Sequence, residues 1–319
     1  MGLLVEGNWA DQWYDTKSSG GRFVRQDSAF RGWVRADGST KHRPEAGRYH
    51  LYVSLACPWA HRTLIFRKLK KLEGAISVNV VDPYMREQGW IFGNTPGATP
   101  DELFASQYLY EIYQRARPDY TGRVTVPVLW DKELGMIVNN ESSEIIRMFN
   151  SEFDAIGEAS LDFYPAELRD EIDAINEFVY PRINNGVYRC GFATTQDAYD
   201  EAFCDLFSAL DTLEERLSRQ RYLVGDRTTE ADWRLFTTLV RFDPVYVGHF
   251  KCNLRRIADY SNLAGYLREF YQVPGISDTV NMMHIKHHYY GSHATINPTG
   301  VVPVGPEFDL DRPHGRELL

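Results

Sequence analysis

Hydrophobic residues change their spacing along the chain, and this change predicts two kinds of structure. Up to about residue 149, short apolar runs alternate with segments in which apolar residues recur every three or four positions, which predicts strands alternating with helices. The predicted strands are 48–53, 76–81, 124–131 and 136–139, and the predicted helices are 59–72 and 142–149. The strand–helix–strand order predicts a parallel pair with a right-handed crossover, and the turn that contains Gly135 predicts a hairpin.

From about residue 166 onward, the apolar spacing is helical almost throughout. The first helical stripe consists of Leu168, Ile172, Ile175, Val179 and Ile183. We expect Pro181 to kink or end this helix, because proline has no backbone N–H to donate. Further helices are expected over 203–217, 233–242 and 263–271. Thr229 and Asp232 resemble a capping box, with Asp where Glu or Gln is usual, and they precede the helix expected over 233–242.

These patterns predict an α/β fold followed by an all-α part. The order β-α-β, insertion, β-β-α is the plan of a thioredoxin-like domain, and the helices after it form a second domain. The expected segments are an extended N-terminal arm at 1–45, a thioredoxin-like domain at 46–153 with an insertion at 84–120, a helical domain at 166–290 and a tail at 291–319. The middle of the insertion, 102–115, has helical character.

Composition and charge narrow the classes of function. The 319 residues are 43% hydrophobic and 25% charged, which is typical of a soluble globular protein. A net charge of −9 opposes binding to the phosphates of nucleic acids, so we expect no nucleic-acid partner. No apolar run approaches the roughly 20 residues that span a bilayer, and the N-terminus lacks a basic-then-apolar signal. We therefore expect a cytoplasmic enzyme that does not enter membranes.

The potential metal ligands do not form a recognisable site. Four cysteines are widely spaced and fit no zinc pattern: Cys57, Cys190, Cys204 and Cys252. Their wide spacing suits a reducing compartment. Four histidines also gather near the C-terminus, at positions 284, 287, 288 and 293, but their spacing matches no standard motif. We therefore expect no bound metal.

The segment 51–62 carries the strongest chemical signal in the chain. It reads as a strand that ends at Cys57, followed by Pro58 in the first turn of a helix. A helix N-terminus favours negative charge, and we expect it to lower the pKa of the thiol from about 8.5 into the range of roughly 3.5–7.5. The alternative is an inert buried cysteine, but the strand, the proline and the cations that follow favour a reactive thiol.

The residue three positions after this cysteine limits the redox chemistry. A dithiol site reads Cys-x-x-Cys, whereas here the second position is Ala60. Cys57 therefore needs an external thiol to complete a redox cycle, and glutathione is the first candidate.

Two further positions predict a site for a peptide-like thiol. Pro127 follows Val126 at the start of a strand, and we expect a cis peptide bond there that lets the backbone of Val126 pair with the ligand as an added strand. Glu141 and Ser142 begin the next helix, where a carboxylate can bind to the N–H groups and Glu141 can pair with an ammonium group. The alternatives are a proline on an edge strand and simple N-capping by Ser142.

These residues together resemble the glutathione transferase superfamily, and the sequence Cys-Pro-Trp-Ala-His-Arg at 57–62 resembles its Xi class, the glutathionyl-hydroquinone reductases. The resemblance covers roughly residues 5–310. It also includes Val81–Pro83, Gly89–Trp90, Arg123–Asp131, Asn139–Ile145, Asn184–Tyr188, Ala231–Phe236, Arg241–Tyr246, His284–Lys286 and Tyr289.

The resemblance implies a role for each matching residue. Cys57 is expected to be the nucleophile, Tyr188 to exchange a proton with the quinol ring, and Tyr246 and Tyr289 to donate hydrogen bonds to the thiolate. The residues expected to hold glutathione are Trp90, Arg123, Val126, Glu141 and Ser142. The resemblance also implies a homodimer.

Two other functions fit the same residues. One is a cysteine-type transferase of the omega kind, acting as a thiol transferase or dehydroascorbate reductase. The other is a transferase-like binding module without catalysis, which the intact thiol and glutathione residues disfavour. The tyrosine trio at positions 188, 246 and 289 favours glutathionyl-hydroquinone reduction over the omega-type reaction.

Overall fold

The computed structural model describes residues 2–307 and 309–319, and it divides into two compact units. Unit 1 consists of Met1–Trp13, Gln26–Asp162 and Thr279–Val301, and unit 2 of Tyr14–Arg25, Phe163–Asp278 and Val302–Leu319. The domain boundaries expected from the sequence stay a prediction. Among the described residues, no helix combines the length and apolar character that crossing a membrane requires.

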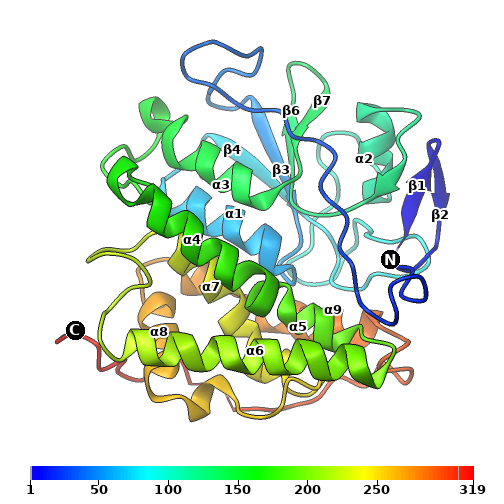
Figure 1. Ribbon diagram of the computed structural model, residues 1–319. Coiled ribbons are helices and arrows are strands. Elements are labelled where there is room, and N and C mark those ends of the chain that lie inside the picture. The colour runs from blue at the N-terminus through cyan, green and yellow to red at the C-terminus, as the bar shows by residue number, and fades with distance from the viewer. Residues whose placement is uncertain (1, 308) are drawn as a thin grey trace. The chain divides into compact units, whose positions relative to one another are not determined.

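A four-stranded sheet forms the centre of unit 1, in the order β4-β3-β6-β7 (Figure 1). Its strands are β3 (Tyr49–Val53), β4 (Ile76–Val80), β6 (Val128–Asp131) and β7 (Met136–Asn139). β3 pairs with β4 in parallel, whereas the β3–β6 and β6–β7 pairs are antiparallel, so the predicted crossover and hairpin are confirmed. The strand predicted from residue 124 begins only at Val128, because Pro127 cannot donate to a sheet ladder.

Alternating side chains of β3 are buried on both faces of this sheet. Tyr49 packs edge-on against Phe153, which follows α3 (Ser142–Ser151). Tyr52 points to the other face, where its hydroxyl donates to Asp101 and its ring lies 5.7 Å from that of Phe92. Figure 1 shows α1 (Pro58–Leu69) and α3 side by side against the sheet. The N-termini of α1 and α3, which follow β3 and β7, therefore both belong to unit 1.

The insertion and the arm depart in part from the sequence expectations. Helix α2 runs over Leu109–Ala116, so the helix expected from residue 102 begins later. The Glu111 side chain accepts the Tyr108 N–H in a capping box, which fixes that start. The arm is not wholly extended: β1 (Leu3–Val5) and β2 (Asn8–Ala10) form a hairpin, and β1 also pairs with β5 (Gly122–Arg123).

Unit 2 is helical, as predicted. Its α-helices are α4 (Arg169–Val179), α5 (Gly186–Gly191), α6 (Gln196–Leu217), α7 (Glu230–Arg241) and α8 (Ser261–Tyr271). Pro181 lies in a π-helical segment, Tyr180–Asn184, that follows α4, which accounts for the predicted interruption. The helix α9 (Met282–Ser292) lies in unit 1.

The capping box predicted at the start of α7 is present. The Asp232 carboxylate accepts the backbone N–H and the hydroxyl of Thr229, and it also accepts the Leu223 N–H and the Tyr266 hydroxyl, each at 2.8–2.9 Å. A fully buried carboxylate is tolerated there because four donors satisfy it. Asp232 thereby fixes the start of the buried helix that leads to Tyr246.

We predict that His50 on β3 makes the fold sensitive to acid. Burial, assisted by the positive charge of Lys132, lowers the pKa of His50 from 6.5 to about 4. The folded protein favours the neutral ring of His50. The contribution of this ring to the free energy of unfolding is therefore complete above pH 6.5 and is lost as the pH falls towards 4. Between pH 7 and pH 4, wild type should lose about 3 kcal/mol more of its free energy of unfolding than His50→Gln, measured by urea titration. Equal losses in the two proteins would contradict this assignment.

Candidate active site

Cys57 lies at the N-cap position of α1, where the sequence places it. Its backbone is extended (φ −76°, ψ 122°), Pro58 occupies the first helical turn, and the Cys57 carbonyl accepts the His61 N–H at 2.9 Å. The side chain is half-buried. No acidic residue lies in the first turn of α1, so the backbone N–H groups and the helix dipole stabilise negative charge on the sulfur.

The backbone of Val126 lies directly beside this sulfur. The peptide bond between Val126 and Pro127 is cis, which confirms the prediction. The Cys57 Sγ is 3.6 Å from the carbonyl oxygen of Val126 and donates to it as a thiol. A ligand that pairs with the Val126 backbone would thus hold its own sulfur next to Cys57.

Glu141 and Ser142 begin α3, also as predicted. Glu141 is the N-cap residue, and its Oε1 accepts the backbone N–H and the hydroxyl of Ser143, at 3.0 and 2.9 Å. Burial alone would raise the pKa of Glu141, but the bonds from Ser143 and the positive charge of Arg62 outweigh it, so the pKa lies below its usual 4.5. Glu141 is therefore ionised at neutral pH and can pair with an ammonium group.

Arg62 connects the thiol helix to the start of α3, a role that the sequence reasoning missed. Its side chain is buried, its Nη1 donates to the Ser142 hydroxyl at 3.5 Å, and its guanidinium lies 4.5 Å from the centre of the Trp59 ring. The sequence signal was a cation one turn into the helix that follows Cys57. Because Arg62 and Cys57 share α1, this contact links the position of the sulfur to that of Ser142.

Trp90 and Arg123 lie in unit 1 with these groups. The Trp90 indole is buried and stacks face to face on His288, with ring centroids 4.8 Å apart. The Arg123 guanidinium donates to two backbone carbonyls of the arm, those of Gln12 and Trp13. The predicted roles of Trp90 and Arg123 in binding glutathione stay predictions.

The three tyrosines fall into both units. Tyr289 is buried on α9 in unit 1, where its ring contacts those of His288 and His293. Tyr188 and Tyr246 lie in unit 2 with ring centroids 6.1 Å apart. Each of these two also contacts Phe250, which stacks on Tyr246 at 5.5 Å. Their approach to the thiolate stays a prediction.

An arginine beside Tyr188 was not anticipated from the sequence. The guanidinium of Arg25 lies 5.0 Å from the centre of the Tyr188 ring, and its Nε donates to the Asn185 side chain at 3.0 Å. A cation over the face of an aromatic ring is attracted by the negative charge of that face. Arg25 therefore places a positive charge beside the aromatic cluster of unit 2.

The remaining cysteines and histidines form no metal site in the part of the chain that the structure describes. Cys190 and Cys252 are buried near each other, and burial is the main cause that raises the pKa of the Cys252 thiol well above its usual value. A buried thiol that stays protonated is a poor nucleophile. Cys57 is therefore the better placed of these thiols for chemistry.

This arrangement suits chemistry on a thiol-containing peptide. One sulfur nucleophile lies at a helix N-terminus, a backbone carbonyl lies beside it, and an ionised carboxylate begins the neighbouring helix. No dithiol partner follows in the motif, since residue 60 is alanine. A mixed disulfide formed at Cys57 would therefore await a second external thiol.

Comparisons with known proteins agree with this description. The model of the glutathione S-transferase N-terminal domain matches residues 56–152, and that of the C-terminal domain matches residues 196–269. The glutathionyl-hydroquinone reductase YqjG of Escherichia coli K-12 is 58% identical over 325 residues, covering 100% of this chain and 99% of that protein. The glutathionyl-hydroquinone reductase PcpF of Sphingobium chlorophenolicum is 59% identical over 306 residues, covering 96% of each.

Solved structures give the same family. A glutathione-bound structure of YqjG has a TM-score of 0.91 at 55% sequence identity, covering 99% of both chains. The Xi-class glutathione transferase of Natrialba magadii has a TM-score of 0.93 at 53% identity, covering 99% of this chain and 96% of that one. The predicted thioredoxin-like domain followed by a helical domain is thereby confirmed, and the chain belongs to the glutathione transferase superfamily, in the Xi-class family of glutathionyl-hydroquinone reductases.

Proposed function

We propose that this protein uses glutathione to reduce glutathionyl-hydroquinones to hydroquinones. The observation that carries the proposal is the position of Cys57, at the N-terminus of α1 and 3.6 Å from the Val126 carbonyl, with Ala60 in place of a second thiol. The high identity to two glutathionyl-hydroquinone reductases over nearly the whole chain supports the substrate class. Glutathione is a co-substrate here, and the chemistry needs no metal.

The reaction divides into two thiol steps. In the first, Tyr188 protonates the ring carbon that carries the thioether, and the ring loses a phenolic proton to become a ketone. The Cys57 thiolate then attacks the glutathione sulfur, the carbon–sulfur bond breaks with its electron pair returning to the ring, and the resulting phenolate takes up a proton to give the hydroquinone. The ring is reduced by two electrons, and the two sulfurs are oxidised to a mixed disulfide. In the second step, a glutathione thiolate attacks that disulfide, restores Cys57 and leaves as oxidised glutathione.

The other site residues would bind and orient the substrate. Val126 would pair with the cysteinyl part of glutathione, and Glu141 with Ser142 would hold the ammonium and carboxylate of its γ-glutamyl end. Trp90 and Arg123 would complete the glutathione site, and Tyr246 and Tyr289 would donate hydrogen bonds to the thiolate. The expected location is the cytoplasm.

A general thiol transferase is the second candidate function. Cys57, Val126 and Glu141 all lie in unit 1 and would suffice to exchange a disulfide with glutathione. That reaction does not include protonation of a ring carbon, so it does not need Tyr188 as a general acid. Tyr188 therefore distinguishes the two functions.

We predict that Tyr188→Phe loses hydroquinone release but keeps thiol exchange. Loss of a general acid typically slows a reaction by about 100-fold or more. The measurement is anaerobic turnover of a model glutathionyl-hydroquinone with glutathione, beside reduction of a small mixed disulfide of glutathione. The second rate should stay within about twofold of wild type, because it involves no protonation of a ring carbon.

Tyr199→Phe is the matched control for this experiment. Its hydroxyl also lies in unit 2, but it donates to the Lys251 carbonyl at 2.7 Å, outside the aromatic cluster of Tyr188. The control should keep both activities. If wild type reduces the mixed disulfide but releases no hydroquinone, the reductase proposal is wrong and the thiol transferase remains.

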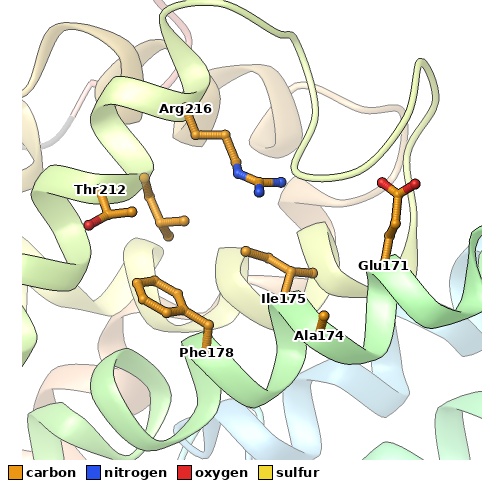
Figure 2. A pocket seen from close by; sticks show the side chains of 7 residues that line it. Glu171, Ala174, Ile175, Phe178, Thr212 and Arg216 are labelled. Atoms are coloured by element: carbon orange, nitrogen blue, oxygen red, sulfur yellow. The ribbon is translucent and has the colours of Figure 1, made fainter.

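We also propose that the protein is a homodimer that uses the groove between α4 and α6. The groove is a hollow of about 290 Å³ with an apolar lining that includes Ile175, Phe178 and Leu213. Figure 2 shows the charged groups of Glu171, from α4, and Arg216, from α6, beside this lining. In a two-fold dimer the same surface of each subunit meets its copy. Glu171 would then pair with the partner's Arg216, and Arg216 with the partner's Glu171.

Charge reversal tests this interface. Glu171→Arg should shift the protein towards monomer, because two like charges would then meet across the two-fold axis. The double variant Glu171→Arg/Arg216→Glu should restore the dimer, and Glu177→Arg, which changes an exposed residue of α4 that is not part of the groove lining, should leave it intact. Sedimentation velocity measures the distribution. A wild-type monomer, or a Glu171→Arg dimer as stable as wild type, would contradict the proposed interface.

A further inference from the structure

The N-terminal arm runs along the start of α3 within unit 1. The Phe30 N–H donates to the Asn140 side chain, and the Asn140 N–H donates back to the Phe30 carbonyl, both at 3.0 Å. Phe30 is buried, and its ring packs edge-on against Tyr113. Asn140 immediately precedes Glu141. This reciprocal pair of hydrogen bonds therefore fixes the arm beside Glu141, the residue predicted to pair with the ammonium group of glutathione.

Further contacts hold the same stretch of the arm along α3. Arg31 forms a two-point ion pair with Glu144, with Nε–Oε2 at 2.8 Å and Nη2–Oε1 at 2.5 Å. Farther along the arm, the Ala36 N–H donates to the Glu152 carboxylate at 2.8 Å. The arm is thus attached at Phe30 to the residue before the N-cap of α3, and at two later points to α3 and its C-cap, which leaves little freedom for the residues near Phe30.

Ser28 lies two residues before Phe30 and reaches the Glu141 carboxylate. Its hydroxyl is 3.1 Å from Glu141 Oε2 and 3.2 Å from the Asn140 carbonyl. A hydroxyl has one proton, and the ionised carboxylate is the stronger acceptor of the two. Ser28 is half-buried, so this bond is shielded in part from water.

The two oxygens of Glu141 thus have different tasks. Oε1 accepts both bonds from Ser143 and caps α3. Oε2 accepts the bond from Ser28 and keeps a further lone pair for a ligand. Bonds on both oxygens fix the plane of the carboxylate, which otherwise rotates at little cost because glutamate has several flexible torsions.

We infer that Ser28 of the N-terminal arm is a positioning residue for the glutathione site, which orients Glu141 Oε2 towards the ammonium group of the γ-glutamyl end. The inference rests on the proposed role of Glu141. The N-terminal arm is then part of the binding site, because the Ser28 hydroxyl orients Glu141 from a segment more than 110 residues earlier in the chain. An orientation fixed in advance improves binding because less side-chain entropy is lost when the ligand arrives.

The test compares two ligands that differ in the ammonium group. The probes are S-methylglutathione, which cannot form a disulfide with Cys57, and its deaminated analogue, in which the γ-glutamyl ammonium is replaced by hydrogen. Isothermal titration calorimetry gives the Kd of each for wild type, Ser28→Ala, Ser28→Thr and Ser39→Ala. Ser39 is an exposed serine of the same arm and serves as the matched control.

Ser28→Ala should weaken binding of S-methylglutathione about fivefold and change binding of the deaminated analogue less than about twofold. Ser28→Thr, which keeps the hydroxyl, should restore the affinity, and Ser39→Ala should match wild type. If Ser28→Ala weakens both ligands equally, the arm only supports the fold and the inference is wrong. If wild type itself binds both ligands equally, Glu141 does not hold the ammonium, and both the inference and that part of the proposed function are overturned.

Discussion

The contact between the Cys57 sulfur and the Val126 carbonyl is the constraint on which the rest of the site depends. The two groups come from segments 69 residues apart, and they meet at 3.6 Å because β3, which leads to Cys57, pairs directly with β6, which follows Val126. Because β3 is buried on both faces, a shift by one residue would exchange the side chains that pack on the two faces and disrupt both packing layers. Sheet register therefore sets the distance at which a ligand's sulfur could approach the thiolate.

The buried charge of Arg62 links the helix that begins at the thiol, α1, to the start of the neighbouring helix α3. Arg62 is nearly inaccessible to solvent, and it pairs with the start of α3 by a hydrogen bond to Ser142 and by attraction to Glu141. Removing one member of such a group leaves an uncompensated charge in the interior, which is costly. The bonds from Ser143, aided by the charge of Arg62, outweigh burial and lower the pKa of Glu141, so the carboxylate is ionised for a ligand with an ammonium group.

Local signals explain what could be predicted from the sequence. Cys57 with Pro58 marked the start of α1, Pro127 marked the cis bond, and Thr229 with Asp232 marked the start of α7, because each of these features depends on residues a few positions apart. The arm hairpin was missed because its strands have three residues each and no clear alternation, and the pairing of β1 with Gly122–Arg123 was missed because it joins segments far apart in the chain. The partners of Arg62 and Ser28 were missed for the same reason. The roles of Tyr188 and Tyr246 came from the family resemblance, since nothing in the spacing of 19 tyrosines distinguishes them.

In the proposed reaction Cys57 takes the glutathionyl group from the substrate, and a single-turnover experiment follows this transfer. Enzyme is mixed anaerobically with one equivalent of a glutathionyl-hydroquinone, without added glutathione, and is quenched in acid for peptide mass spectrometry. We predict one equivalent of hydroquinone and one glutathionyl group on the peptide that contains Cys57, with neither product formed by Cys57→Ser. Release of hydroquinone without this adduct, or an adduct on Cys190, Cys204 or Cys252 instead, would show that Cys57 is not the nucleophile.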